Sequence, residues 1–514
     1  MSPEPQKSSI FKVIGASSLG TLIEWYDFYI FGSLATIIGA QLFPADAGAS
    51  ALINTLAIFA AGFIVRPFGA LVFGRLGDLI GRKYTFLLTL VLMGGSTFLI
   101  GVIPSYSSIG YAAPILVLIL RLIQGLALGG EYGGAATYVA EHAPAGRRGF
   151  FTSWIQTTAT GGLFLSLGII VLTKNLLGAA VFADWGWRVP FLLSILLVGV
   201  SIYIRMKMQE SPMFSKLKTE GKVSKNPLKE SFRHKTNFKM VLLALFGATM
   251  GQGVIWYTGQ FYAQSFLENT CKIDFNDSRY ILLWGIVFAT PFFVIFGSWS
   301  DKVGRKWIML TGMLLGILCY RPIYQTFLDD TDLSKVSTQD ILSSTTVKTE
   351  ATLAEGTPDS LITTEALVML RDGSSYKMVT TVTRHTGAGD YLIPPEKVSY
   401  KDKKLATPVF WKFVGLIFFQ ILLVTMVYGP IAAFLVELFP TKIRYTSMSL
   451  PYHVGNGVFG GLVPFIATLI ASFQGSTPLS GLWYPIGIAA LSFVIGAIYL
   501  SNKKPDHGEA EHAH

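Results

Sequence analysis

Long apolar runs separated by short polar segments recur along the whole chain. A helix needs about 20 such residues to cross roughly 30 Å of hydrocarbon, and twelve runs reach this length. They predict transmembrane helices at residues 12–38, 51–74, 84–104, 112–138, 151–174, 188–206, 239–267, 279–299, 307–327, 410–436, 446–473 and 482–501.

Composition supports a membrane protein. Only 14% of the 514 residues are charged and 51% are hydrophobic, whereas a soluble chain carries about 25% charged residues. The formal net charge of +10 could suggest nucleic acid, but the basic residues gather in loops that follow even-numbered spans. Between Arg205 and Lys239, ten Lys and Arg stand against three Asp and Glu. The positive-inside rule therefore predicts that both termini are cytoplasmic in a multi-pass cell membrane protein, and we expect no nucleic-acid partner.

Two patterns occur twice in the same order. "GRLGDLIGRK" at 74–83 follows the second span, and "GSWSDKVGRK" at 297–306 follows the eighth. Glu141, Pro144 and Arg148 match Glu437, Pro440 and Arg444 at identical offsets. Matched markers in one order predict a duplicated six-helix unit.

The duplication also locates an insertion. The second half has about 70 more residues between its markers than the first half, and they fall within 328–404. Within this polar segment, "ALVMLRDGSSYKMVTTVT" places β-favouring residues on both sides of Asp372-Gly373 and predicts a β-hairpin. Disorder throughout is the alternative for so Ser/Thr-rich a segment. The predicted organisation is an N-terminal bundle 1–206, a cytoplasmic linker 207–238, helices seven to nine at 239–327, an external insertion 328–409, helices ten to twelve at 410–501 and a cytoplasmic tail 502–514.

The motifs resemble one transporter family. The repeated G-x-x-x-D-x-x-G-R-K resembles the signature loop of the major facilitator superfamily, and "RLIQGLALGGEYGGA" at 121–135 resembles its fourth-helix motif. With "EWYDFYIFG" and "RPFGALVFGRLGD", the chain is similar to the metabolite:proton symporters. This resemblance implies an all-α fold of twelve transmembrane helices in two pseudo-symmetric six-helix bundles, with the small insertion as an addition.

Two charged residues lie deep in their spans. At about 1.5 Å per residue, Asp27 is roughly 22 Å from the inner start of its span and Arg121 roughly 14 Å from the outer start of its own. Both heights fall in the central region of the bilayer, where charged groups are paired, hydrated or functional. By resemblance, Asp27 and Arg121 are assigned to proton coupling. A permanent salt bridge between two helices is the alternative.

Neighbouring charged residues extend this group. Glu24 lies one helical turn before Asp27 and shares the proton or lines the cavity. Arg66 on the second span and Glu131 on the fourth belong to the inner half of the bilayer. Glu131 is a further candidate for proton coupling, whereas Arg66 either pairs with an acid or binds the carboxylate of an anionic substrate.

The seventh span combines glycines with amide and aromatic groups. Gln252, Trp256, Tyr257 and Gln260 can bind a polar ligand near the membrane midplane, and Asn456 on the eleventh span is a weaker candidate, as is His453. Close helix packing explains the glycines of the seventh span equally well, but not the glutamines.

The repeated loops have a mechanical interpretation. Their glycines permit a tight turn, and Asp78 can sit at a helix N-terminus and meet a basic residue across the interface between the halves. Such contacts would hold one state closed on the inside. The predicted gating residues are Gly74, Asp78, Gly81, Arg82, Glu141, Arg148, Asp301, Gly304, Arg305, Glu437 and Arg444.

These features predict a secondary carrier rather than an enzyme. We expect it to import a small polar metabolite with protons by alternating access, most simply an organic acid anion, in a lipid bilayer and as a monomer. A zwitterionic osmolyte such as proline or betaine is the alternative substrate, and a transporter-derived sensor is the rival function. The G-x-G-x-x-G at 455–460 lies in an apolar span and no Walker motif is present, so we expect no cofactor and no metal.

Overall fold

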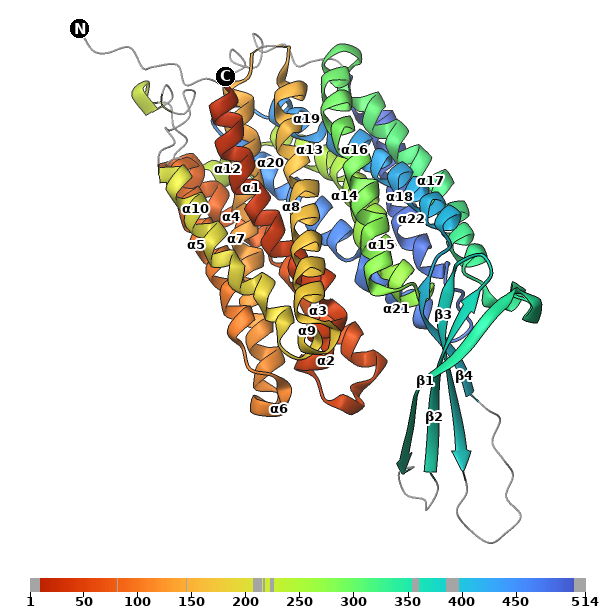
Figure 1. Ribbon diagram of the computed structural model, residues 1–514. Coiled ribbons are helices and arrows are strands. Elements are labelled where there is room, and N and C mark those ends of the chain that lie inside the picture. Colours follow the sequence, from red (N-terminus) through yellow and green to blue (C-terminus); the bar gives the residue numbers. More distant parts are fainter. Residues whose placement is uncertain are drawn as a thin grey trace. The chain divides into compact units, whose positions relative to one another are not determined.

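The computed structural model describes residues 10–80, 82–144, 146–206, 215, 218–221, 226–353, 360–384 and 397–502. They divide into two compact units. The larger comprises Met1–Tyr262, Ile286–Tyr320 and Phe419–His514, and the smaller comprises Ala263–Gly285 and Arg321–Phe418. Each unit is described by itself (Figure 1).

The predicted spans are present as helices. Ten helical stretches of the described residues are long and apolar enough to cross a membrane, and α1 and α5 occupy the remaining two predicted spans. The prediction of twelve transmembrane helices in two bundles is confirmed. In the first half the helices are α1 (Ile10–Ser33), α2 (Ala35–Leu42), α3 (Ala49–Ile64), α4 (Arg66–Ile80), α5 (Arg82–Val102), α6 (Tyr106–Ile109), α7 (Ala112–His142), α8 (Arg148–Leu177), α9 (Ala179–Asp184) and α10 (Val189–Met206).

The second half is less regular. Its helices are α12 (Pro227–Arg233), α13 (Lys235–Ala244), α14 (Met250–Tyr257), α15 (Ala263–Ser265), α16 (Phe275–Val303), α17 (Arg305–Asp330), α18 (Thr407–Tyr428), α19 (Ile431–Leu438), α20 (Arg444–Tyr452), α21 (Val463–Ser472) and α22 (Trp483–Tyr499). Four π-helical segments interrupt the seventh and eleventh spans: η3 (Leu245–Thr249), η4 (Thr258–Tyr262), η5 (Phe266–Thr270) and η8 (His453–Gly460).

Prolines explain two of the breaks. The second span divides into α3 and α4 at Val65, just before Pro67, and the tenth divides into α18 and α19 beside Pro430. Proline has no N–H to donate and clashes with the preceding turn, so it begins a helix more easily than it continues one. The break in the second span places Arg66 at the first residue of α4.

Glycines bring the second and fourth spans into backbone contact. A Cβ atom on Gly62 would lie 3.1 Å from the carbonyl oxygen of Arg121, and Cβ atoms on Gly69, Gly125 and Gly129 would overlap the facing backbone. Small residues of this kind let transmembrane helices approach closely. This contact fixes the height of Arg121 next to the second span.

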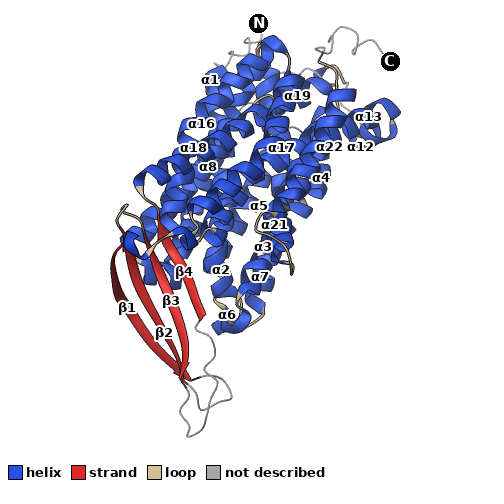
Figure 2. Cartoon of the chain, turned by 90° about the vertical axis from the view of Figure 1, so that its right-hand side faces the viewer, coloured by secondary structure: helices blue, strands red, loops and turns tan. Residues whose placement is uncertain are grey.

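The smaller unit contains a four-stranded antiparallel sheet in the order β1-β2-β3-β4 (Figure 2). The strands are β1 (Ile341–Leu353), β2 (Ser360–Leu370), β3 (Ser375–Arg384) and β4 (Lys397–Lys404). The predicted hairpin is confirmed: β2 and β3 pair from Met369↔Ser375 outward, and Gly373 takes a φ of 86° in the turn. Strands β1 and β4 were not predicted.

One end of the sheet is attached to the segment between the seventh and eighth spans. Lys403 forms a parallel bridge with Ile273, its carbonyl accepts from the amide of Asp274 at 2.8 Å, and its Nζ donates to the carbonyl of Thr331 at 2.6 Å. Val368, Leu370 and Tyr376 form a small core on one face of the sheet. The insertion is therefore a folded element within the smaller unit.

Candidate functional site

The π-helical turns of the seventh and eleventh spans face each other within the larger unit. A Cβ atom on Gly253 of α14 would lie 2.7 Å from Cα of Asn456, and one on Gly455 would lie 2.5 Å from the backbone carbonyl carbon of Thr249. The glycines thus serve close packing, as the packing interpretation expects. Widened π-helical turns occur often at functional sites, where they redirect side chains.

A chain of polar groups connects these two spans. Gln252 Nε2 donates to Asn456 Oδ1 at 3.2 Å, and Asn456 Nδ2 donates to the hydroxyl of Tyr452 at 3.1 Å. The Tyr452 and Tyr428 hydroxyls lie 2.9 Å apart. All of these side chains are buried. The predicted residues Gln252 and Asn456 are therefore direct partners.

The series of polar contacts continues into the first half of the protein through an aromatic stack. The rings of Tyr452 and Tyr132 lie 3.6 Å apart with an interplanar angle of 5°, and Gln156 Nε2 donates to the Tyr132 hydroxyl at 2.6 Å. Tyr132 and Gln156 belong to α7 and α8. This stack joins the two halves of the protein immediately beside the Gln252–Asn456 pair.

Arg66 lies against the same part of the eleventh span. Its guanidinium carbon is 4.3 Å from the centre of the Phe63 ring. A Cβ atom on Gly457 would lie 3.3 Å from Arg66 Cδ. Tyr257 and His453 lie close to Arg66. Arg66 therefore lies beside the predicted substrate residues, which favours its role as a ligand for an anionic group.

Asp27 and Arg121 are both buried, with 0% and 1% exposure. Among the described residues they form no direct ion pair, and neither carboxylate oxygen of Asp27 has a hydrogen-bond partner. Arg121 Nη1 donates to Gln124 Oε1, and Gln124 Nε2 donates to Thr97 Oγ1 at 2.8 Å. The Thr97 hydroxyl lies next to the Asp27 carboxyl and donates to the Met93 carbonyl at 3.0 Å. Gln124 and Thr97 therefore lie between the arginine and the acid, but the hydrogen bonds from Arg121 end at Met93.

Arg121 is also held by aromatic and backbone groups. Its guanidinium carbon lies 4.7 Å from the centre of the Phe31 ring and 4.9 Å from that of Phe59, and Nη2 donates to the Phe59 carbonyl at 3.4 Å. Such contacts stabilise a cation where water is excluded. Asp27 and Arg121 therefore do not pair directly in this conformation, and the alternative of a permanent salt bridge is not formed here.

An aromatic cluster surrounds the site. Trp25 and Tyr29 of α1 lie 5.4 Å and 5.9 Å from Trp256, ring centre to ring centre, and Trp256 lies 4.7 Å from Tyr257. Phe261 joins Tyr29 at 5.1 Å. These contacts place two of the predicted substrate residues, Trp256 and Tyr257, beside the helix that carries Asp27.

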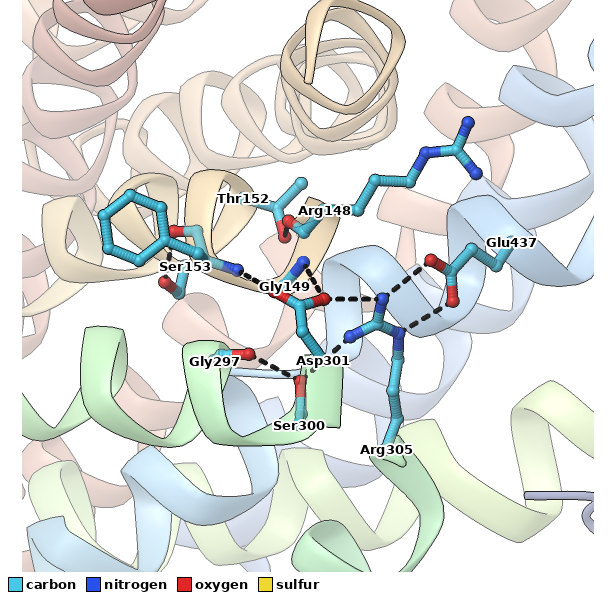
Figure 3. Close-up of polar contacts among 10 residues, drawn as sticks. Arg148, Gly149, Thr152, Ser153, Gly297, Ser300, Asp301, Arg305 and Glu437 are labelled. Atoms are coloured by element: carbon cyan, nitrogen blue, oxygen red, sulfur yellow. Dashed lines mark hydrogen bonds and ion pairs between the residues drawn. The ribbon is translucent and has the colours of Figure 1, made fainter. Parts of the chain in front are cut away.

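The loop after the eighth span forms a charged contact with the first half (Figure 3). Asp301 Oδ1 accepts from the amide of Gly149 at 2.8 Å, and Oδ2 accepts from that of Phe150 at 2.9 Å. Arg305 donates to Asp301 at 3.1 Å and to both carboxylate oxygens of Glu437, at 2.7 and 2.8 Å. Since Gly149 and Phe150 lie in the first turn of α8, Asp301 satisfies amides that lack a partner within the helix.

The loop after the second span makes the matching contact. Asp78 Oδ2 accepts from the amide of Thr446 at 3.1 Å and from its hydroxyl at 2.7 Å, in the first turn of α20. Nearby, Arg444 Nη1 donates to Glu141 Oε1 at 3.4 Å, and the Tyr445 hydroxyl donates to the Gly130 carbonyl. The halves are therefore closed against each other on the side of these loops.

The expected turn at the first loop is wrong for two of its glycines. Gly74 and Gly77 do not form a turn, because both lie inside α4. They instead make room for α20: a Cβ atom on Gly74 would lie 3.4 Å from Thr446 Cα, and one on Gly77 would overlap the Tyr445 ring. Gly304 does follow a helix end, with a φ of 94° that suits glycine.

Arg148 departs from the symmetry that its spacing suggests. Its counterpart Arg444 binds Glu141, but Glu437 is bound by Arg305 instead. Figure 3 shows the Arg148 guanidinium away from the Asp301–Arg305 contact. The predicted Gly81 and the side chains of Glu24, Arg82 and Glu131 lie outside the described residues. Gln260 is buried in η4.

The sequence interpretation missed several members of the site. Gln124, Thr97, Tyr132 and Gln156 take part in its hydrogen bonds, and the buried His453 is only a weak candidate from its sequence context. The available signal was the presence of an amide or hydroxyl inside an apolar span, which costs free energy unless it finds a partner. Threonines and tyrosines are too common in such spans for this signal to select them.

Comparison with known proteins identifies the family. A model described as sugar (and other) transporter matches residues 12–224. A putative metabolite transport protein of Haemophilus influenzae is 30% identical over 482 residues, covering 91% of each chain. The chain belongs to the major facilitator superfamily. Within it, the sequence falls in the family of sugar-transporter-like metabolite symporters, and the protein is a multi-pass membrane protein and not an enzyme.

Other superfamily members match to different extents. The proline/betaine transporter of Escherichia coli is 36% identical over 310 residues, but the match spans only 59% of this chain and 61% of that protein. The α-ketoglutarate permease of the same organism is 29% identical over 487 residues, covering 95% and 92%. A partially occluded, inward-open structure of the xylose transporter XylE from E. coli superposes with a TM-score of 0.63 at 16% identity, covering 97% of this chain and 99% of that one, which shows the shared fold.

Proposed function

We propose that this protein is a proton-coupled secondary transporter that imports a small organic acid anion by alternating access. The observation that carries the proposal is the buried Asp27 carboxyl next to Thr97, which accepts from Gln124, itself the partner of the buried Arg121. A carboxyl and a cation in a low-dielectric interior are costly unless they are paired, hydrated or neutralised, and such groups inside transmembrane helices mark proton or substrate pathways.

Proton coupling follows from the way these groups interact. When Asp27 holds a proton it is neutral, and Arg121 keeps its bond to Gln124. When the proton leaves, the carboxylate attracts the Thr97–Gln124–Arg121 chain, which packs on α3 and α5. Proton binding and the packing of the first four spans are then linked, as a symporter requires.

The substrate carboxylate would bind Arg66. This arginine lies beside Tyr257 and the Gln252–Asn456 pair, so an anion there would meet groups from both halves of the protein. A ligand held by both halves is the requirement for two bundles that rock about one site.

Uptake into proteoliposomes tests the proposal. With an alkaline interior, wild-type protein should accumulate a labelled organic acid above its external concentration, and Asp27→Asn should abolish accumulation while exchange of labelled for unlabelled substrate continues. Asp46→Asn, which removes an exposed carboxylate, is the control and should transport normally. Unchanged accumulation by Asp27→Asn would remove Asp27 from the mechanism. A sensor would give no uptake at all.

A second candidate substrate is a zwitterion such as betaine. The aromatic cluster of Trp25, Tyr29, Trp256, Tyr257 and Phe261 favours it, because aromatic faces bind quaternary ammonium groups, and the E. coli proline/betaine transporter is a relative. Competition of unlabelled betaine and of unlabelled organic acids against uptake distinguishes the two candidates.

We also propose that both termini face the cytoplasm, from the distribution of basic residues. A reporter enzyme that is active only in the periplasm, fused after residue 502, should be inactive, whereas the same reporter inserted at 373 in the β2–β3 turn should be active.

A further inference from the structure

His453 is a buried histidine that the proposed proton pathway does not use. It is the first residue of η8 and is 2% exposed. In the part of the chain that the structure describes, neither of its ring nitrogens has a hydrogen-bond partner. A neutral imidazole presents one donor and one acceptor, and buried polar atoms in native proteins nearly always have partners. Both ring nitrogens of His453 are therefore available to hydrogen-bond a bound ligand.

His453 lies near the predicted substrate residues. Gly457 lies one turn after His453 on the same face of the eleventh span, and a Cβ atom there would lie 3.3 Å from Arg66 Cδ. The ring also meets Tyr452 edge to face, at 5.1 Å between centres. His453 thus lies close to Arg66 and next to Tyr452, the hydrogen-bond partner of Asn456.

Other buried hydrogen-bonding atoms of the seventh span share the same condition. Among described residues, Trp256 Nε1, Gln252 Oε1 and both amide atoms of Gln260 have no hydrogen-bond partner, and all three side chains are 0% exposed. The trimethylammonium group of a betaine makes no conventional hydrogen bond to such atoms. A ligand that carries a hydroxyl as well as carboxylate or carbonyl oxygens supplies both a donor and acceptors.

We propose that His453 is a specificity-determining residue that hydrogen-bonds a hydroxyl or carbonyl oxygen of the substrate while Arg66 binds its carboxylate. The proposal rests on the proposed transport function and narrows it to small acids that carry a further oxygen, namely hydroxy or oxo acids. Recognition then needs one group from each half: Arg66 from the second span and His453 from the eleventh. Acids without the second oxygen leave the imidazole unmatched and bind more weakly.

The test uses pairs of acids that differ by one hydroxyl. Binding of malate and succinate, and of lactate and propionate, is measured on the purified full-length protein by ligand-induced shifts of the unfolding temperature over a concentration series. Wild-type protein should bind at least one hydroxy acid about tenfold or more tightly than its partner. His453→Phe, which fills the space but cannot hydrogen-bond, should reduce that ratio to within about twofold, and His453→Asn should restore part of it.

A matched histidine provides the control. His142 already bonds the Tyr138 carbonyl at 2.7 Å, and His142→Phe should keep the wild-type ratio. If His453→Phe does not yield folded protein, His453→Asn and His453→Gln carry the test. Each should change the ratio between the affinities for paired acids while the unfolding temperature without ligand stays near the wild-type value.

The two proposals fail in different ways. Equal binding of paired acids by the wild type, or an unchanged ratio in His453→Phe, overturns the role of His453 even if proton-driven uptake is observed. Selective binding that is lost in His453→Phe supports that role, and the absence of proton-driven uptake of the same acid would then overturn only the transport proposal.

Discussion

The loop after the second span and the loop after the eighth carry the same motif, and both place its aspartate at the first turn of a helix from the other half. Asp78 meets α20 and Asp301 meets α8. Asp78 accepts from the amide and the hydroxyl of Thr446. Asp301 accepts from the amides of Gly149 and Phe150 and from Arg305, a residue of its own half.

The difference shows which part of the motif is common to both halves. Helix N-termini carry partial positive charge and amides without partners, so an aspartate there is stabilised whatever the neighbouring side chains are. The arginine bonds to Asp301 and Glu437 add a charged network in the second loop. The corresponding Arg82 side chain lies outside the described residues, so the common feature established for both loops is the aspartate and its helix partner.

The largest effect is expected for Arg305→Ala. Asp301 and Glu437 are 7% and 12% exposed at their side chains, and removing one partner from a buried charged contact costs about 3–5 kcal/mol. The closed arrangement of the loops should be destabilised relative to the open one by most of this free energy. Ser449→Cys, in a variant whose native cysteines are replaced, reports opening, because Ser449 is 0% exposed against Gly133.

The maleimide labelling rate of Cys at 449 should rise at least about 100-fold in Arg305→Ala. Arg75→Ala removes an exposed arginine of α4 and should leave the rate unchanged. A rise of less than about twofold in Arg305→Ala would show that the charged network does not hold this side closed.

Asp301→Asn should have the next largest effect. It removes the negative charge from two amide bonds and from Arg305, while Arg305 keeps Glu437. Charged hydrogen bonds contribute about 1.5–3 kcal/mol, so a loss of about 2 kcal/mol and a roughly 30-fold faster labelling of the same reporter are expected. An increase equal to that of Arg305→Ala would mean that the arginine acts only through Asp301.

The sequence predicted these loops well because their signals are local. The repeated motif, its spacing from the spans and the preference of carboxylates for helix N-termini were sufficient to place Asp78 and Asp301 between the halves. The prediction of a turn at Gly74 and Gly77 was wrong, because glycine serves both turns and close helix contacts, and only the position of α20 decides between them.

The central site was predicted less completely. Depth in the membrane follows from residue number, so Asp27 and Arg121 were correctly expected to be buried. Residue number does not give the rotation of one helix about its axis relative to another. The intervening Gln124 and Thr97 were therefore missed, and the role of these four residues in proton coupling stays a prediction.

The sheet of the smaller unit shows the same limit. The β2–β3 hairpin has a strong local signal in Asp372-Gly373 between β-favouring residues. Strand β4, "KVSYKDKK", has little intrinsic β preference and forms because it pairs with β3 and joins Ile273, contacts that no local pattern encodes.

Thr446→Val should have a smaller effect than either change in the second loop. It removes the hydroxyl that donates to Asp78 and leaves the amide bond of the same residue intact. A hydrogen bond to a carboxylate contributes about 1.5 kcal/mol at the low end of its range, and only one such bond is lost here, so the labelling rate should rise by roughly tenfold. Thr446→Ser keeps the hydroxyl and is the control. Equal rates for Thr446→Val and Thr446→Ser would exclude the hydroxyl as a contributor.

The smallest expected quantity is the interaction energy between the two loops. The hydrogen bonds of Asp78 to Thr446 and those of Asp301 to Gly149 and Phe150 share no residue, and changes at sites without shared partners add within about 0.5 kcal/mol. Asp301→Asn combined with Thr446→Val should therefore raise the labelling rate by the product of the separate factors. A combined effect no larger than that of Asp301→Asn alone would mean that the second loop by itself holds the halves together. The first loop would then open only as a consequence, and the symmetry of the two aspartates would not extend to their mechanical roles.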